Sequence, residues 1–245
     1  MLNEITFSNA WEFFPCTVDG NSLSVRFDVS VMGLDDAMKS TYPHTLIIFI
    51  KAVNFDFEFL NKIEDGFARG PFNIRQIGAI TGGEGIRYVF CLDDAAAADV
   101  DGVVRALLGE NQPNLNYECN FIENNNFEYF YNVLMPNIYE QQWISNRHVC
   151  ANLENAGEAY KEARDIDFYC YFQTEQNIQN VAEKLEQQGF KKITQEKTEQ
   201  GDYMLHLIMH DIPEFGRINH LTSEILDALQ GTDGQFDGWG SPIHK

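Results

Sequence analysis

Strict alternation between apolar and polar residues is the feature that most restricts the fold of this chain. Such alternation is typical of a half-buried β-strand, which has one face on a core and the other in water. It occurs three times, far apart in the sequence, at Leu23 to Val31, Leu115 to Phe121 and Ile166 to Phe172. The continuous apolar run Leu46 to Ile50 adds a strand covered on both faces. Half-buried strands interspersed with helical patterns predict an α+β fold.

Turn signals join several strands into hairpins. Asp19-Gly20 separates Trp11 to Val18 from the alternating strand that starts at Ser22, and this dipeptide is a strong hairpin signal. Thr81-Gly82-Gly83-Glu84-Gly85 joins Ile74–Ile80 to Ile86–Leu92 in the same way. This turn lacks the Gly-Lys-Ser/Thr ending of a phosphate loop and links two strands, so a simple hairpin is favoured over a nucleotide site.

Helical patterns complete the N-terminal half. We predict one helix at Phe55–Phe67 and another at Phe127–Met135. A third helix is predicted between them, capped by Asp93 or Asp94 and ended by Gly109. With about six strands and two or three helices, residues 1–136 are predicted to be one α+β domain with an antiparallel sheet.

Residues 137–245 are predicted to form a second domain, which opens with a polar helical connector. A strand at Ile166–Phe172 precedes a helix capped by Thr174. Two further strands and a helix whose first turn holds Pro213 follow. The order β-α-β-β-α is that of a ferredoxin-like α/β sandwich, with two helices on one face of an antiparallel sheet.

The charge balance restricts the class of partner. The formal net charge is −20, and both halves are acidic, because residues 136–245 alone hold 9 Lys and Arg against 18 Asp and Glu. A phosphate backbone would be repelled, so direct nucleic-acid binding is not expected. A basic protein surface would be attracted. The alternative is that the acidity serves solubility alone.

Cysteine usage and the absence of apolar segments point to the cytoplasm. The five cysteines are scattered and form no CxxC pair, which favours free thiols over disulfides or zinc. The N-terminus has neither the basic nor the apolar region of a signal peptide. No apolar run approaches membrane-spanning length.

We predict no catalytic residue, metal site or cofactor. No Gly-x-Ser-x-Gly or His-Glu-x-x-His motif occurs. His206 and His210 would lie about 13 Å apart on one strand, too far to share a metal. His210 and Asp211 could converge with His220, but surface or satisfied core histidines are the better interpretation. Cys150 has His148 nearby, but nothing in the sequence distinguishes this pair from a buried thiol and a histidine on a helix surface.

The last fifth of the chain ends in Phe236-Asp237-Gly238-Trp239-Gly240, after an apolar helical stripe from Ile218 to Leu229. The glycines predict tight turns that bring the two aromatic residues together. Either both aromatic side chains pack on the core as a plug, or they form an exposed anchor for a protein partner. We name Phe236, Asp237 and Trp239 as candidate partner-binding residues.

This ending resembles that of the regulator of ribonuclease E activity B (RraB) family, whose usual form is Tyr-Asp-Gly-Trp. The strand Asp167–Phe172 and the strand pair about Gly201 match as well, and the resemblance covers about residues 140–245. It implies an acidic, cytoplasmic, bacterial protein that binds a ribonuclease E-type endoribonuclease and lowers its activity without cutting RNA.

The N-terminal half, from Trp11-Glu12-Phe13-Phe14-Pro15 through the first hairpin, resembles a bacterial domain-of-unknown-function family numbered six hundred and ninety-five. That resemblance implies no activity. The favoured hypothesis is therefore a non-catalytic regulator that inhibits a ribonuclease E-type or other RNA-processing protein. The alternative is an enzyme or small-ligand-binding protein with a site between the two domains.

Overall fold

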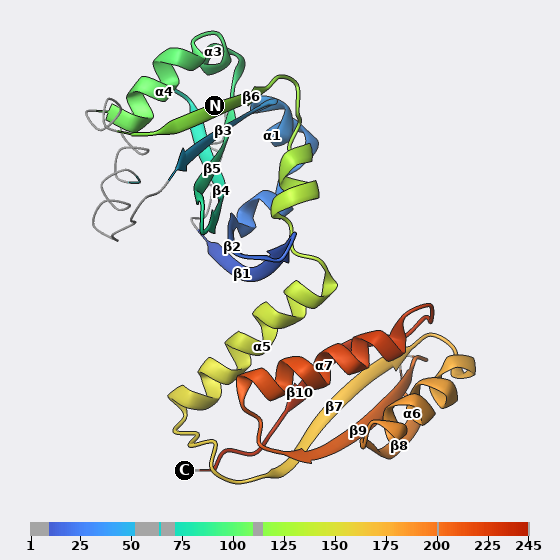
Figure 1. Ribbon diagram of the computed structural model, residues 1–245. Helices are drawn as coiled ribbons and strands as arrows, with labels where there is room; N and C mark the ends of the chain where they lie inside the picture. The colour runs from blue at the N-terminus through green and yellow to red at the C-terminus, as the bar shows by residue number, and fades with distance from the viewer. Residues whose placement is uncertain (1–9, 52–63, 65–71, 110–114, 200, 245) are drawn as a thin grey trace. The chain divides into compact units, whose positions relative to one another are not determined.

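The chain divides into two compact units, Met1–Pro136 and Asn137–Lys245. The computed structural model describes residues 10–51, 64, 72–109, 115–199 and 201–244. Each unit holds one antiparallel sheet with its own helices (Figure 1), so the α+β class predicted from the alternating strands is confirmed.

Six strands form the sheet of the N-terminal unit within the described residues, in the order β1-β2-β4-β5-β3-β6. Both predicted hairpins are present, β1–β2 and β4–β5. The predicted second strand was too long, because the Asp28 carboxylate accepts the Ser30 N–H and starts a 3-10 turn there. The strands are β1 Trp11–Val18, β2 Asn21–Asp28, β3 His44–Lys51, β4 Ile74–Gly82, β5 Gly85–Leu92 and β6 Tyr117–Ile122.

Helices α3 (Asp94–Ala97) and α4 (Val100–Leu108) replace the single helix predicted after Asp93. Asp93 caps the first by accepting the Ala96 N–H, and Asp99 then caps the second. The apolar sides of these helices pack against the inward side chains of β3 and β5 and form one core with them. This core includes Leu46 of β3, Tyr88 and Phe90 of β5, and Val103 and Leu107 of α4. The helix predicted at Phe55–Phe67 lies outside the described residues, apart from position 64.

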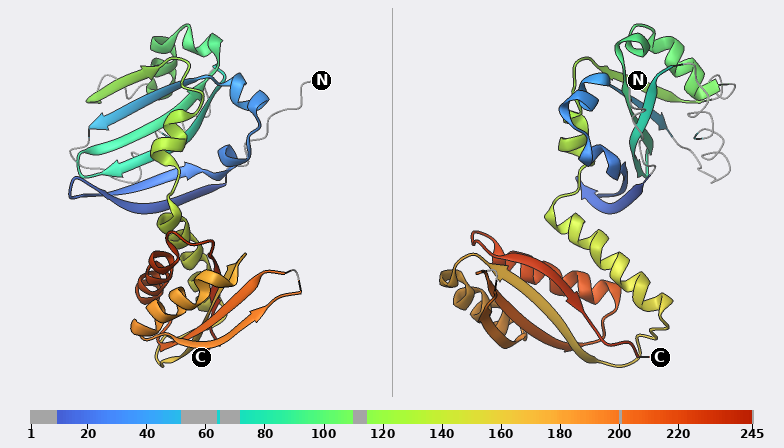
Figure 2. Two further views of the ribbon diagram at one scale, coloured as in Figure 1. Left: turned by 90° about the vertical axis from the view of Figure 1, so that its right-hand side faces the viewer. Right: turned by 180° about the vertical axis from the view of Figure 1, so that it is seen from behind.

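The opposite face of this sheet is covered in part by α1 (Asp36–Thr41) and by the segment after β6 (Figure 2). Phe130 lies edge-on to Phe27, which lies edge-on to Phe14, with ring centroids 6.3 and 6.0 Å apart. The predicted helix at Phe127–Met135 is a π-helical turn, Phe130–Leu134. Among the described residues, no helix lies over the β3–β6 part of this face.

The β4–β5 turn requires glycine at one position and tolerates alanine at another. Gly85 has φ +152°, and a Cβ there would lie 2.2 Å from the backbone oxygen of Ile50. At Gly83 a Cβ would meet nothing within 4 Å. We expect Gly85→Ala to lower the free energy of unfolding of this unit by about 1–3 kcal/mol, and Gly83→Ala to leave it nearly unchanged. Urea unfolding followed by hydrogen exchange of the β4 and β5 peptides measures both; equal effects would contradict the prediction.

The C-terminal unit has the complete β-α-β-β-α-β order of a ferredoxin-like fold. Its sheet runs β10-β7-β9-β8 with every neighbouring pair antiparallel. A final strand, β10, therefore completes the predicted sandwich. The elements are α5 Ile138–Asn155, β7 Arg164–Phe172, α6 Ile178–Gln187, β8 Lys191–Lys197, β9 Tyr203–Asp211, α7 Phe215–Leu229 and β10 Gln235–Gly240.

Two predicted helix starts in this unit were wrong. Helix α7 begins at Phe215 after the extended residue Glu214, so Pro213 precedes the cap. Thr174 donates its N–H and hydroxyl to the Asp233 carboxylate, so its side chain does not cap α6. The Thr174 hydroxyl therefore bonds the Asp233 carboxylate, which is distant in the sequence, instead of a backbone N–H of the following helix.

Candidate functional site: the C-terminal sheet and its closing strand

The closing segment Phe236-Asp237-Gly238-Trp239-Gly240 is an edge strand and not a run of tight turns. It pairs with β7 so that Phe236 lies opposite Cys170 and Trp239 opposite Phe168. A bulge at Asp237 separates these two pairs and returns both aromatic side chains to the same face. Both aromatic side chains pack at the core of this unit, and strand register rather than the predicted tight turns places them there.

The three candidate partner-binding residues have different environments. Trp239 is buried, with 9% of its surface exposed, and belongs to the core of the unit. Phe236 is half-buried against Phe168, with ring centroids 6.5 Å apart, and Asp237 is exposed. Of the two alternatives for Trp239, the core plug describes its position. The register of β10 turns this side chain inward, and a role of Phe236, Asp237 and Trp239 in partner binding stays a prediction.

A buried asparagine explains how the plug is held. Asn146, on α5, has no exposed surface and accepts the Trp239 indole N–H at 2.9 Å. Its amide donates to Asn219 Oδ1 at 2.9 Å and to Thr222 Oγ1 at 2.8 Å, both on α7. Gln142 Nε2 donates to the same Asn146 oxygen. One amide therefore joins α5, α7 and β10.

Sequence reasoning did not identify Asn146, although a signal was present. It stands four residues before Cys150 and seven before Leu153, so all three share one face of α5. Cys150 and Leu153 are buried in the core. A polar residue on an apolar helical face is the pattern of a buried hydrogen-bonding side chain.

Within the described part of the C-terminal unit, no helix packs on the other face of the sheet. Helices α6 and α7 pack on one side only, as Figures 1 and 2 show. On the opposite side, β7 and β9 present polar, aromatic and partly exposed apolar side chains. We call this surface the open sheet face; it consists of Asp165, Asp167, Tyr169, Tyr171, Met204, His206, Ile208 and His210.

Two carboxylate–histidine pairs order the open sheet face. His206 Nε2 lies 2.7 Å from Asp167 Oδ1, and its ring stacks on Tyr169 with centroids 4.7 Å apart and planes 12° apart. His210 Nδ1 lies 2.9 Å from Asp165 Oδ1, and both of these side chains are more than half exposed. The face therefore combines an aromatic platform with anionic oxygens at its border.

Two glycines on β10 place no side chain beside Tyr169 and Asp167 of the open sheet face. Gly238 lies opposite Tyr169, and Gly240 opposite Asp167. A Cβ at either glycine would meet no atom within 4 Å. A flat side chain of a partner could therefore approach Tyr169 from the β10 edge, where Asp237 adds another carboxylate.

Residues considered for catalysis or metal binding are held apart. His210 bonds Asp165, Asp211 accepts from Arg217 Nε at 2.6 Å, and His220 faces Glu224 on α7. Each of these three side chains therefore has a partner of its own. No group of three or more His, Cys, Asp and Glu with metal-site geometry occurs among the described residues.

Cys150 is not suited to nucleophilic catalysis. Burial raises the pKa of its thiol to about 11, an effect only partly offset by the hydrogen bond with Tyr160. The thiol is therefore protonated at neutral pH, whereas the thiolate is the nucleophile.

Comparison with known proteins finds a family model similar to most of the C-terminal unit. Residues 143–241 match the family model described as regulator of ribonuclease activity B. The match includes β7 to β10, α6, α7 and most of α5, and so both the Asn146–Trp239 bond and the open sheet face. It supports the resemblance seen at the closing segment, and it covers less than half of the chain.

Other comparisons add no functional information. The chain has no significant match among curated proteins. A solved structure assigned provisionally as a glycine cleavage system transcriptional repressor shares 8% identity, with 81% of this chain and 98% of that chain covered and a TM-score of 0.25. An unknown protein from Galdieria sulphuraria shares 7% identity, with 79% and 96% covered and a TM-score of 0.22. Scores this low do not indicate a shared fold. None of the described helices is long and apolar enough to cross a bilayer.

Proposed function

We propose that this chain is a non-catalytic, cytoplasmic regulatory protein that binds a ribonuclease E-type endoribonuclease and inhibits it. The observation that carries the proposal is the family match of residues 143–241 to a regulator of ribonuclease activity. The excess of acidic residues supports it, because an acidic protein is attracted to the basic segments with which RNA-processing proteins hold RNA.

The open sheet face is the surface we assign to this partner. Arginine side chains stack on aromatic rings and form paired hydrogen bonds with carboxylates. The face offers both, since Asp167 is the nearest neighbour of Tyr169 on the same side of β7, and Asp165 follows it along the strand. A basic partner segment would place one arginine over the ring with its N–H groups toward Asp167, and a second cation toward Asp165.

RNA itself is a poorer ligand for this face, although some four-stranded sheets stack bases on aromatic residues. Such platforms rely on positive charge near the backbone phosphates. Here Asp167 lies beside Tyr169 on β7, Asp165 lies further along the same face, and Asp237 precedes the residue opposite Tyr169 on β10, so a phosphate chain would meet like charge.

The N-terminal unit has an accessory role in this proposal. Its resemblance to the domain family numbered six hundred and ninety-five stays a prediction, and that family brings no activity. Its own net charge is negative, so it would add to the attraction for a basic partner.

The test is binding of the full chain to a purified ribonuclease E-type protein, at low and at near-physiological ionic strength. We expect saturable binding that weakens with added salt, together with slower RNA cleavage by the nuclease. Binding to single-stranded RNA alone, or no binding to the nuclease at either salt concentration, would contradict the proposal.

A charge variant locates the contact. We expect Asp165→Asn with Asp167→Asn to weaken nuclease binding about ten-fold, mainly through a slower association rate. The amide oxygens can still accept from His206 and His210, so the fold is retained. Glu183→Gln with Glu186→Gln is the matched control, because it removes the same charge from exposed positions on α6. Equal effects of the two double variants would place the contact elsewhere.

A further inference from the structure

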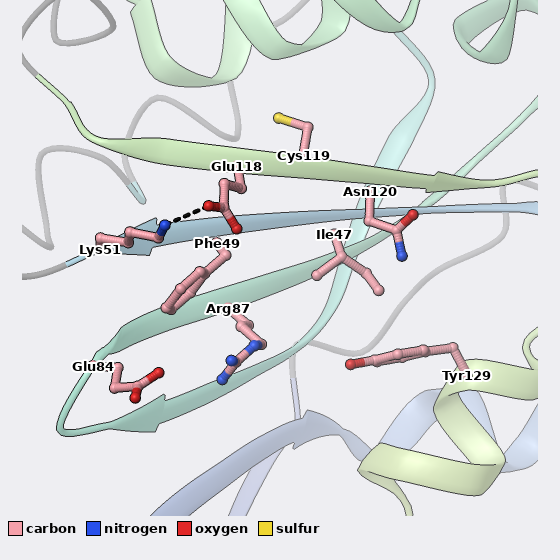
Figure 3. Close-up of a pocket in the computed structure, with 9 residues that line it drawn as sticks. All are labelled: Ile47, Phe49, Lys51, Glu84, Arg87, Glu118, Cys119, Asn120 and Tyr129. Atoms are coloured by element: carbon pink, nitrogen blue, oxygen red, sulfur yellow. Dashed lines mark hydrogen bonds and ion pairs between the residues drawn. The ribbon is translucent and has the colours of Figure 1, made fainter.

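A cleft in the N-terminal unit lies on the sheet face opposite α3 and α4, over β3, β5 and β6. Its volume is about 540 Å³, within the range of small-molecule sites. Its floor is made by Ile47 and Phe49 of β3, and Figure 3 shows Arg87 of β5 and Asn120 of β6 beside them. The strand register places these four side chains on the same face. The cleft therefore has an apolar floor with polar groups on both sides.

Arg87 brings a guanidinium group to the floor of this cleft. Its guanidinium carbon lies 4.3 Å from the centroid of the Phe49 ring, and the side chain is half-buried. Among the described residues it forms no hydrogen bond or ion pair. Stacking on a ring fixes the plane of a guanidinium while its N–H groups stay available at the edge. Such an edge matches the two oxygens of a carboxylate.

Tyr129 supplies a neutral donor on the opposite wall. Burial raises the pKa of its phenol, and the nearby charge of Arg87 offsets this only in part, so the group stays an O–H donor. Figure 3 shows the hydroxyl directed toward the Arg87 side of the cleft. Asn125 holds this residue in position, because its side-chain oxygen accepts both the Tyr129 N–H and the Thr45 hydroxyl, each at 2.9 Å.

The other charged side chains that line the cleft are Lys51, Glu118 and Glu84. Lys51 is already paired with Glu118 at the far end of β3. Glu84 is exposed at the β4–β5 turn and forms no ion pair with a described residue. An anion entering the cleft would therefore find the Arg87 guanidinium, which no described residue pairs with, over an apolar floor and with the Glu84 carboxylate at the rim.

We propose that this cleft binds a small organic carboxylate with an apolar body, held by Arg87 through its carboxylate and by Ile47 and Phe49 through its hydrocarbon part. Tyr129 and Asn120 donate further hydrogen bonds to the same oxygens. The site is separate from the nuclease-binding surface proposed for the C-terminal unit and does not depend on it.

The experiment uses the full chain and ligand-observed NMR titration with phenylacetate, hexanoate and indole-3-acetate, each compared with its neutral amide. We expect at least one carboxylate to bind roughly ten-fold or more tightly than its amide, since hydrogen bonds to charged groups are the strong ones. Arg87→Met, which keeps the contact with Phe49, should abolish that preference. Arg105→Met removes an exposed arginine on α4 and should preserve it.

A second variant distinguishes a specific site from general attraction to a cation. Glu84→Gln should strengthen carboxylate binding about two- to five-fold, because it removes the like charge at the rim. Failure of all three carboxylates to bind, equal binding of acids and amides, or an Arg87→Met variant that binds like the unaltered chain would overturn the proposal. Ribonuclease binding should be the same in Arg87→Met and in the unaltered chain.

Discussion

Replacing Trp239 by alanine is expected to destabilise the C-terminal unit by about 3–5 kcal/mol, the usual cost of removing a buried tryptophan. The indole is buried among the side chains of the unit's core. Its removal leaves a cavity between β10 and the helices. It also deprives the buried Asn146 oxygen of one of its two donors.

The measurement is hydrogen exchange of the full chain under native conditions, read from peptides of β7 and α7. Protection of both should fall together in Trp239→Ala, because the Asn146 network joins their layers. Trp239→Phe fills most of the space and loses the indole N–H, so a smaller loss of about 1–3 kcal/mol is expected. Asp237→Ala, two residues away and exposed, is the control and should leave protection unchanged.

The Trp239→Ala variant also distinguishes between the two roles considered for the closing segment. If Trp239 acts only by packing in the core, nuclease binding and the stability of the C-terminal unit decline together. A Trp239→Ala chain with native protection and lost nuclease binding would instead restore the exposed-anchor interpretation and contradict the buried position seen here.

Alternation predicted the strands because it reports burial directly. The inward residues Ile166, Phe168 and Cys170 are fully buried, and those between them are not. Strand β10 escaped the same reasoning for two physical reasons. Its outward positions include Gly238 and Gly240, which carry no polar side chain to mark the alternation, and the bulge at Asp237 interrupts the period.

The open sheet face could be anticipated only in part. That His206 and His210 share one side of β9 followed from the period of a strand. Their pairing with Asp167 and Asp165 depends on the register between β7 and β9, which lie more than thirty residues apart in the chain. Register is set by the packing of the whole sheet, so no local pattern could show it.

The buried ion pair between Glu158 and Arg164 also could not be predicted from a sequence pattern. Its loss is expected to destabilise the C-terminal unit strongly. Arg164 donates to Glu158, and their side chains are 5% and 0% exposed. Glu158 also accepts the backbone N–H groups of Tyr160 and His244, and Arg164 Nε donates to Ser241. These bonds fasten the last residues of the chain to the start of β7.

We expect Glu158→Ala to destabilise the C-terminal unit by about 3–5 kcal/mol, because it leaves the Arg164 charge buried without its counter-ion. Replacing both residues, as Glu158→Gln with Arg164→Met, should cost less than the alanine variant, since no buried charge then remains. Urea unfolding of the full chain, read through exchange of β7 peptides, compares the two. A double variant less stable than Glu158→Ala would contradict this explanation.

The same carboxylate gives a pH dependence with a defined sign. Burial alone would raise the pKa of Glu158, but the N–H groups of His244 and Tyr160 together with Arg164 outweigh it, so the pKa is lowered. A lowered pKa means that the stabilisation is complete above the ordinary glutamate pKa of about 4.3 and is lost as the pH falls through the lower value in the folded protein. The free energy of unfolding should therefore decline more steeply below about pH 4.3 in the unaltered chain than in Glu158→Gln. Parallel acid profiles for the two proteins would show that this pair does not carry the effect.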